Sequence, residues 1–359
     1  MATTHKIIHN LRKERKKMKK IFSYLLITVM IGSAISNVEI TKAQDTHESP
    51  VRVYSPENPG VEFDEKYLDL KNIDVKVEEG KVVCDTTDIA IQEEFDEILS
   101  ESDELEGSII ESIQDSKQLV GIITVTAGVE EVYQNVGGKP VCVSSELVSP
   151  FDNDDILNQT ISPYTNTSFV SGYGTQTSIG SGYETKGNLV LSFGVYKTTP
   201  TSYASEYYLM GIADWTNGLI AGENTPANGD DYLGLYWGGN FASKDKNITI
   251  QVSNGSLKPD LIKNSSYLAG SSANKAVVYG FTEFIAGERP STLDIAAVSA
   301  TLYKNTLTGN GNETTFSAKY IHTYQSTVGS ITISNPSGFT LSSCDKQWSL
   351  VAEVDEIKY

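Results

Sequence analysis

The sequence predicts a mainly β fold: a C-terminal β-sandwich or jelly-roll-like domain, preceded by a small acidic α+β or partly disordered N-terminal region. Three observations support this prediction. From residue 188 onward, short runs rich in β-branched and aromatic residues are separated by turns rich in Gly, Asn, Pro and Ser, a pattern typical of sandwiches and jelly rolls. That part has about 170 residues, enough to bury a stable core. Acidic residues gather before residue 117, where one stretch has helical spacing.

Residues 1–43 are predicted to be a signal peptide. Two lysines precede an apolar run at Ile21–Ile35, and Thr41–Ala43 fits the small-x-small pattern of a cleavage site. The run is shorter than the ~20 apolar residues that a membrane-spanning helix needs. The mature chain is expected to begin near Gln44; cleavage after Ala34 and an uncleaved anchor are the alternatives. Because no second apolar run follows, we expect a secreted, extracellular protein with no integral membrane segment after cleavage.

The charge of the chain excludes some partners. The chain holds 28 basic and 46 acidic residues; without residues 1–43, which hold 9 and 2, the mature chain has 19 and 44, a net charge of −25. Such a charge opposes binding to nucleic acids and to anionic lipid surfaces, because their phosphates attract Lys and Arg. Residues 45–116 alone hold 5 basic and 22 acidic residues. This asymmetry predicts a separate acidic leader or pro-region at residues 44–118, which could attract calcium or a cationic partner.

Three parts of this acidic region are predicted in order. Residues 45–64 are rich in Pro and polar residues and are expected to be extended and unstructured. Two alternating runs, 72–77 and 81–84, predict a hairpin. Asp88–Gln114 has helical spacing, with Asp88 as N-cap and Gly107 expected to divide the helix. Its apolar stripe is predicted to be a packing face; a pro-segment that covers a functional surface is the alternative.

Strands dominate the rest of the chain. Residues 119–187 are predicted to hold two strands, 119–126 and 140–148, and then a Ser/Thr/Gly-rich linker from residue 152. Residues 188–359 form the predicted sandwich domain. Its expected strands are residues 189–196, 203–215, 232–237, 248–252, 276–285, 293–303, 314–324, 331–334, 339–342 and 348–354.

Three cysteines, Cys84, Cys142 and Cys344, remain after export, and an odd number cannot all pair within one chain. A Cys84–Cys142 bridge and three free, buried thiols are both consistent with the sequence. The cysteines are too sparse and too widely spaced for a zinc site. No cofactor is assigned, and calcium is the one metal that the acidic residues suggest.

The segment 221–242 holds the candidate ligand-binding residues, which are Asp230, Asp231, Tyr232, Tyr236 and Trp237. Carboxylates in a turn can bind calcium through hard oxygen ligands. Exposed Tyr and Trp rings could stack on the apolar face of a sugar. The competing interpretation is structural, because Asp and Asn are common turn formers and a Trp on a strand usually lies in the core.

Two catalytic hypotheses concern other residues. Glycoside hydrolysis needs two carboxyl groups that face each other across a cleft, and Glu206 and Glu283 lie on predicted strands. The other hypothesis concerns His322. A catalytic His322 would need a nearby nucleophile, and no G-x-S-x-G motif occurs. No catalytic residue is therefore assigned.

The structural interpretation of His322 rests on strand alternation. On a strand, alternate residues share one face. That face would hold Phe316, Ala318, Tyr320, His322 and Tyr324. The pattern predicts a buried aromatic face with a hydrogen-bonded histidine.

Several C-terminal runs are similar to a loose group of uncharacterised secreted proteins of Gram-positive bacteria. They are Lys319–Tyr324 (KYIHTY), Gly329–Ser334 (GSITIS), Gly338–Ser342 (GFTLS), Gln347–Leu350 (QWSL), Asp214-Trp215 and Tyr236–Gly239 (YWGG). The similarity covers about residues 188–354. It implies export and a β-rich fold, and it brings no activity and no catalytic residues.

The leading function prediction is non-catalytic binding at or outside the cell surface by a monomer, with an extracellular ligand such as a glycan. One alternative is a secreted toxin or bacteriocin-like protein that is activated by loss of the acidic leader. The Ser/Thr-rich stretch Thr160–Thr185 suggests it, although a membrane β-barrel needs strands with alternating apolar residues. A secreted glycoside hydrolase is the other alternative.

Overall fold

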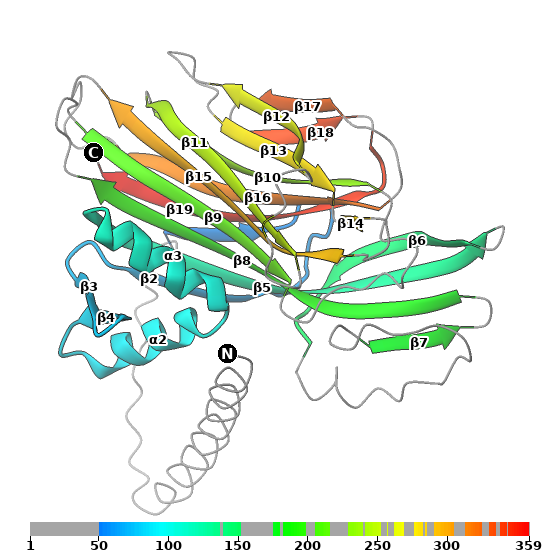
Figure 1. The fold of residues 1–359 in the computed structure, drawn as a ribbon, viewed down its shortest axis with the longest axis horizontal. Coiled ribbons are helices and arrows are strands. Elements are labelled where there is room, and N and C mark those ends of the chain that lie inside the picture. The colour runs from blue at the N-terminus through cyan, green and yellow to red at the C-terminus, as the bar shows by residue number, and fades with distance from the viewer. Residues whose placement is uncertain are drawn as a thin grey trace, which may run out of the picture. The chain divides into compact units, whose positions relative to one another are not determined.

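Two antiparallel β-sheets face each other in a computed structural model of this chain (Figure 1). All described residues belong to one unit, Ser49–Tyr359. The predicted signal peptide, residues 1–43, lies outside the described residues. The structure describes residues 50–136, 139–151, 175–179, 182–198, 205–215, 229–239, 241–252, 257, 262–268, 276–282, 284–285, 291–304, 313–324, 330–334, 338–342 and 344–358.

The first sheet, sheet A, has six strands. Their order across the sheet is β1 (Val51–Tyr54), β19 (Gln347–Lys358), β16 (Glu313–Thr323), β10 (Asp230–Trp237), β13 (Ala276–Thr282) and β12 (Ile262–Leu268). Neighbouring strands are antiparallel, and His322 on β16 lies opposite Trp348 on β19.

The second sheet, sheet B, has nine strands. The main order is β11 (Ala242–Val252), β15 (Ser291–Lys304), β9 (Ser205–Trp215), β8 (Gly182–Thr198), β5 (Lys117–Val136) and β2 (Asp64–Asp69). Three shorter partners are β6 (Lys139–Val148) on β5, β7 (Thr175–Ile179) on β8, and β14 (Phe284–Ile285) on β15. The strands β6 and β7, with the parts of β5 and β8 that pair with them, extend to the right in Figure 1, and we call them the wing.

One apolar core fills the space between the two sheets. Alternate residues of both sheets contribute to it, such as Leu191 and Phe193 on β8 and Phe316 and Ala318 on β16. Because alternate residues of a strand point to opposite faces, each strand has a second face that also needs cover. The predicted β-sandwich is confirmed.

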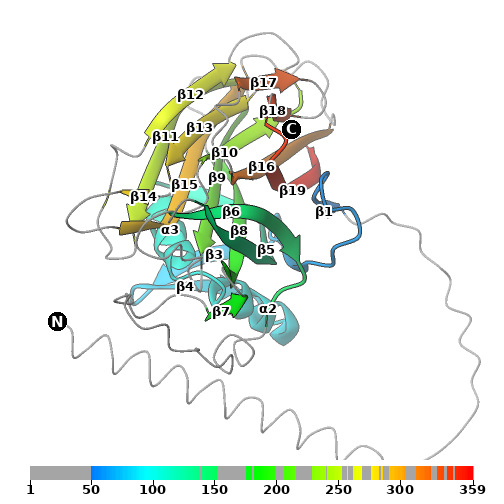
Figure 2. The same ribbon diagram turned by 90° about the vertical axis from the view of Figure 1, so that its right-hand side faces the viewer.

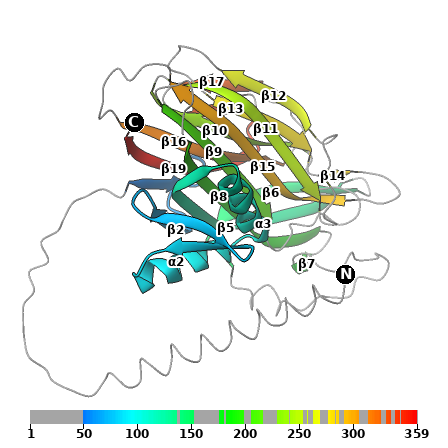
Figure 3. The same ribbon diagram turned by 60° about the vertical axis from the view of Figure 1, so that its left-hand side comes forward.

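Two additional layers cover the outer faces of the sandwich. On sheet B lie the helices α2 (Ile89–Leu99) and α3 (Asp103–Gln114) (Figure 3) and the hairpin β3 (Asp74–Glu78)–β4 (Lys81–Asp85), which is labelled in Figure 1. On sheet A lies the hairpin β17 (Ser330–Ser334)–β18 (Gly338–Ser342) (Figure 2). The hairpin fits closely, since Gly338 has a φ of +73° and a Cβ there would lie 2.7 Å from Tyr236.

The predicted helical stretch 88–114 is two helices. Asp88 caps α2 as predicted, because its side chain accepts a hydrogen bond of 3.0 Å from the backbone N–H of Ala90. The prediction that Gly107 divides the stretch is wrong. The break lies at residues 100–102, where the Ser102 hydroxyl donates to Asp214 at 2.6 Å, and Gly107 is an exposed residue inside α3.

Strand pairing joins the three regions that the sequence suggested, 44–118, 119–187 and 188–359. β1 pairs with β19, β2 pairs with β5, and β5 pairs with β8. Residues 45–64, expected to be unstructured, contain β1. The expected hairpin at residues 72–84 is confirmed by the pairing of β3 with β4.

Candidate functional site

The predicted ligand-binding residues lie on β10, and most of them are buried. Asp231, Tyr232, Tyr236 and Trp237 are all enclosed, and Asp230 is partly exposed. The indole N–H of Trp237 donates to the backbone carbonyl of Phe241 at 3.2 Å, inside the core. Residues 221–228 and 240 of the predicted segment lie outside the described residues.

The three tryptophans do not form an exposed platform. Trp215, Trp237 and Trp348 are 4, 3 and 1 % exposed, and all three belong to the core between the sheets. A ring must be accessible on one face to stack on a sugar. The aromatic residues of the candidate site therefore stabilise the fold instead of presenting a sugar-binding surface.

Asp231 belongs to a buried polar cluster that connects the two sheets. His322 Nδ1 on β16 lies 3.1 Å from Asp231 Oδ1 on β10, and His322 Nε2 lies 3.0 Å from Glu131 Oε1 on β5. Asp231, His322 and Glu131 are 0, 1 and 2 % exposed. The histidine thus bridges a carboxylate of sheet A and a carboxylate of sheet B.

Further hydrogen bonds orient both carboxylates of this cluster. Asp231 accepts from the hydroxyl of Tyr320 and, at 3.1 Å, from the backbone N–H of Thr323. Glu131 accepts from the hydroxyl of Tyr133 at 2.8 Å. Buried carboxylates need such donors, since an ionised group without them is costly to bury.

Aromatic rings enclose the histidine. The ring centroid of His322 lies 4.9 Å from that of Trp348, 6.2 Å from that of Trp215 and 6.3 Å from that of Tyr324. The indole N–H of Trp348 donates to Ser145 on β6 at 2.8 Å. The predicted buried, hydrogen-bonded histidine is confirmed. The ring is 1 % exposed, so it packs in the interior of the described structure.

Asp230, the other predicted carboxylate, faces neighbouring strands. Its Oδ1 accepts from the Thr282 hydroxyl on β13 at 3.0 Å, and its backbone carbonyl accepts from the Thr323 hydroxyl at 2.9 Å. Within the part of the chain that the structure describes, no group of three or more His, Cys, Asp or Glu side chains is arranged to hold a metal ion.

Of the two carboxylates of the hydrolase hypothesis, the structure describes Glu206. Glu206 accepts hydrogen bonds from Thr198 at 3.1 Å and from the Lys244 ammonium at 2.9 Å. Glu283 lies outside the described residues. Of the stretch Thr160–Thr185, named in the toxin hypothesis, the structure describes β7 and the first residues of β8, which are ordinary paired strands of the wing.

The three cysteines are buried thiols that form no disulfide with one another, which agrees with one of the two interpretations of the sequence. Cys84 lies beneath the helices, Cys142 lies in the wing, and Cys344 lies beneath the β17–β18 hairpin. Burial raises the pKa of the Cys84 thiol, and this favours the unreactive protonated form.

A second buried polar group, around Glu353 on β19, was not predicted. It accepts hydrogen bonds of 2.9 Å from both Tyr236 and Ser317 and pairs with Arg52 at 2.6 Å. Burial and the neighbouring Glu353 carboxylate raise the pKa of the Tyr236 hydroxyl, which therefore remains a donor. The registers that place Ser317 beside Tyr236 and Glu353 were not readable from local sequence.

Lys319 is buried on the outer face of sheet A. It is 5 % exposed, lies below the β17–β18 hairpin, and its Nζ donates to the backbone carbonyl of Phe339 at 3.0 Å. Burial lowers the pKa of Lys319, and the carboxylate of Glu57 offsets this lowering only in part.

We expect Lys319→Met to remove a pH dependence of stability. Since the lysine binds its proton more tightly in the unfolded chain, its contribution to the free energy of unfolding of the wild type should rise with pH from the lowered pKa up to about 10.4, the ordinary lysine value. The variant should lack this rise. Denaturant unfolding between about pH 7 and 10 measures it, with Lys197→Met at an exposed lysine as control. Equal pH profiles of wild type and Lys319→Met would contradict the assignment.

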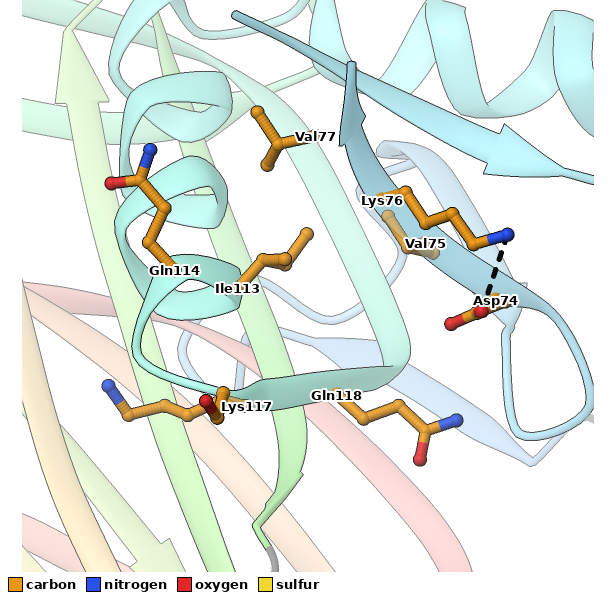
Figure 4. Close-up of a pocket in the computed structure, with 9 residues that line it drawn as sticks. Asp74, Val75, Lys76, Val77, Ile113, Gln114, Lys117 and Gln118 are labelled. Carbon is orange, nitrogen blue, oxygen red and sulfur yellow. Dashed lines mark ion pairs between the residues drawn. The ribbon is translucent and has the colours of Figure 1, made fainter.

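An open pocket of about 360 Å³ lies between β3, the end of α3 and the start of β5 (Figure 4). Its lysines already have partners: Lys76 pairs with Asp85 and, at 3.6 Å, with Asp74, and Lys117 pairs with Asp115 at 2.9 Å. Ile113 and Val77 supply apolar surface on its two sides. The pocket lacks the convergent, buried polar groups that are typical of a ligand site.

None of the described helices is long and apolar enough to span a membrane.

The matches to known proteins are solved structures, and the structural similarity is weak. No protein-family model and no curated protein matches the chain. It is similar to the C-terminal domain of the Streptococcus pyogenes antigen I/II-family protein AspA, with 8 % identity, 57 % of this chain and 88 % of that chain covered, and a TM-score of 0.23.

Two further solved structures are similar at the same level. One is the T6 backbone pilin of serotype M6 Streptococcus pyogenes, with 8 % identity, coverage of 62 % of this chain and 60 % of that chain, and a TM-score of 0.24. The other is the C-terminal domain of the Streptococcus agalactiae AgI/II polypeptide BspA, with 8 % identity, coverage of 66 % and 92 %, and a TM-score of 0.20. At these values no family is assigned and no function is transferred.

Proposed function

We propose that this chain is an exported, non-catalytic binding protein that acts at or outside the cell surface, and that the layer of α2 and α3 presents its binding surface to a cationic ligand. The observation that carries the proposal is the charge of this layer. Each helix has four acidic residues and no Lys or Arg. The apolar faces of the helices pack on sheet B, so the acidic residues are held on a firm support.

The acidic side chains of α2 point away from the sandwich. Glu93, Glu94, Asp96 and Glu97 are exposed, whereas Phe95 between them is buried. Lys66 lies 3.7 Å from Glu97 and compensates part of this charge. A fixed group of exposed carboxylates produces a negative potential, which attracts cationic partners and accelerates their association.

Two further features support a binding role over an enzymatic one. The histidine cluster is sealed in the core, and Glu206 is paired with Lys244. Export rests on the signal-peptide pattern of residues 1–43. A glycan is the less favoured ligand because the aromatic residues of the candidate site are buried.

The test uses the chain that begins at Gln44 and an immobilised Lys-rich peptide as probe. The acidic-layer variant Glu93→Gln/Glu94→Gln/Asp96→Asn is compared with a control that neutralises three exposed carboxylates elsewhere. That control is Glu146→Gln/Glu313→Gln/Asp345→Asn. We expect the acidic-layer variant to bind about tenfold more weakly at low salt, because each exposed charge contributes roughly 0.5 kcal/mol, and the control to bind nearly as well as the wild type.

The outcomes separate local charge from total charge. Equal losses in both variants would show that the net charge of the chain, and not the α2–α3 layer, attracts the peptide. No binding by the wild type would also contradict the proposal. If the wild type and the acidic-layer variant both bind to a glycan array, this result would support the carbohydrate prediction instead of a cationic ligand.

A further inference from the structure

The two ring nitrogens of His322 both face carboxylate oxygens. The distances are 3.1 Å from Nδ1 to Asp231 and 3.0 Å from Nε2 to Glu131. A hydrogen bond needs one proton between the two atoms it joins, and a neutral imidazole carries a single N–H. The folded cluster therefore holds a second proton, either on the ring or on one of the two carboxyl groups. Both placements give the three groups the same net charge of −1.

We propose that Glu131, His322 and Asp231 form a pH-sensitive tie: one proton that the cluster takes up on folding holds the wing against sheet A, and its loss at alkaline pH loosens that contact. The two carboxylates belong to different sheets, so the histidine can join them only while both of its nitrogens have a proton to share. After loss of that proton, one lone pair of the ring faces a carboxylate in a buried site, where the repulsion is strong.

The wing meets sheet A at this place. Glu131 lies on the part of β5 that pairs with β6, opposite Ser145. Ser145 also accepts the hydrogen bond from Trp348 on β19. Tyr324, which follows β16, packs on Tyr133 and Cys142 of the wing. The tie is thus the charged centre of an otherwise aromatic contact.

The titratable groups of the cluster and of its immediate surroundings come from four elements. They are Asp231 on β10, Glu131 and Tyr133 on β5, Tyr320 and Tyr324 in and after β16, and Cys142 on β6. Burial raises the pKa of Tyr324, so that it stays neutral in the pH range of interest. The elements β9 and β19 contribute Trp215 and Trp348, which do not titrate.

The sign of the pH dependence follows from the proton count. In the unfolded chain an imidazole has a pKa of about 6.5 and carboxyl groups have pKa values of about 4. Between about pH 7 and the pH at which the folded cluster releases its proton, folding therefore takes up one proton. The ratio of folded to unfolded molecules should fall about tenfold per pH unit in that range because of this cluster.

The decisive variant is Glu131→Gln. Its amide can donate to Nε2 of His322, while Nδ1–H donates to Asp231 and the amide oxygen still accepts from Tyr133. A neutral ring then satisfies every contact, and no extra proton is needed. Lys319 is present in both proteins, so its opposite pH dependence cancels in the comparison. Glu146→Gln, at an exposed residue of β6, is the matched control.

The first measurement is denaturant unfolding of the wild type and the variants between about pH 7 and 9. The second is hydrogen exchange of the β6 amides over the same pH range, with the β13 amides as internal reference. We expect wild type and Glu146→Gln to take up one proton more on folding than Glu131→Gln. We also expect β6 to lose protection relative to β13 as the pH rises in the wild type but not in Glu131→Gln. Equal proton uptake in all three proteins would overturn the proposal.

A third measurement covers the case in which Glu131→Gln fails to fold. NMR spectra of the wild type at about pH 8 report the protons of the His322 ring and the ionisation of the two carboxyl groups. Two ring N–H protons, or one with a protonated carboxyl group, would support the tie. A ring with one N–H between two ionised carboxylates would overturn it.

Discussion

His322→Ala is expected to lower the free energy of unfolding by about 3–5 kcal/mol, the range for removal of one partner from a buried ionic group. The truncation leaves Asp231 and Glu131 facing each other across an enclosed space without the group that connects them. It also leaves a cavity beside Trp348, whose ring centroid is 4.9 Å from the imidazole. Denaturant unfolding at a pH of about 7 measures the loss.

The two causes of this loss can be separated. Adding Glu131→Gln and Asp231→Asn to His322→Ala removes both buried charges and leaves the cavity. We expect this triple variant to recover part of the lost stability. If His322→Ala alone lowers the free energy of unfolding by less than about 1 kcal/mol, the level of an exposed ion pair, the cluster does not stabilise the sandwich.

Removal of residues 44–118 is expected to prevent the remaining chain from folding. The deletion takes away β1 and β2, which pair with β19 and β5, and it removes the whole layer on sheet B. The layer buries Phe95, Ile98, Leu105 and Ile109. Each such side chain contributes roughly 1.5–3 kcal/mol, so these four alone approach the whole stability of about 5–15 kcal/mol that is typical of a domain.

The deletion also uncovers the outer face of sheet B. Ile122, Tyr196, Met210 and Ile212 lose their cover, and exposed apolar surface of this kind favours aggregation. The matched control is a chain that begins at Pro50 and keeps all described elements; it should unfold like the chain from Gln44. A soluble fragment 119–359 with a cooperative unfolding transition would mean that the acidic segment is a detachable leader after all.

Local sequence patterns predicted most elements of this fold. The alternation in Glu313–Thr323 placed Phe316 and Ala318 on the core face and predicted a buried His322. The β3–β4 hairpin was also predicted from sequence, because Gly80 lies between two alternating runs and favours a tight turn. In the structure the two turn residues, Glu79 and Gly80, have positive φ values of 51° and 78°. These features depend on neighbours a few residues away, and this is why the sequence reveals them.

Long-range pairing was not predictable in the same way. The acidic composition of residues 44–118 predicted a region separate from the rest of the chain. In the structure, however, β1 of this region pairs with β19 at the other end of the chain. The strand β12 lies at an edge of sheet A and has the sequence IKNSSYL. This sequence lacks the alternation of apolar and polar residues that marks a half-buried strand, and the strand was therefore not predicted. Net charge describes the surface of a segment and does not show whether its apolar side packs on a distant sheet.

The environment of the candidate site also depends on packing between segments that are distant in the sequence. Stacking on a sugar would need an exposed face of β10, but the β17–β18 hairpin covers the face that carries Tyr232 and Tyr236. Glu131 was missed because the residues that face each other across two sheets are set by packing and not by sequence spacing. The adjacent carboxylates Glu130 and Glu131, in a part of β5 that is otherwise uncharged, are the one signal that could have marked this position.

Chemical unfolding of the chain from Gln44 to Tyr359, followed by two signals at once, tests most directly whether the acidic segment is a layer of one sandwich. A fluorophore on Glu94→Cys, at an exposed position of α2, reports the acidic layer, and tryptophan fluorescence reports the core. We predict that both signals change at the same denaturant concentration and with the same slope, because the helices and the sheets unfold together. A fluorophore signal that changes at a lower concentration, while the tryptophans remain buried, would contradict this prediction.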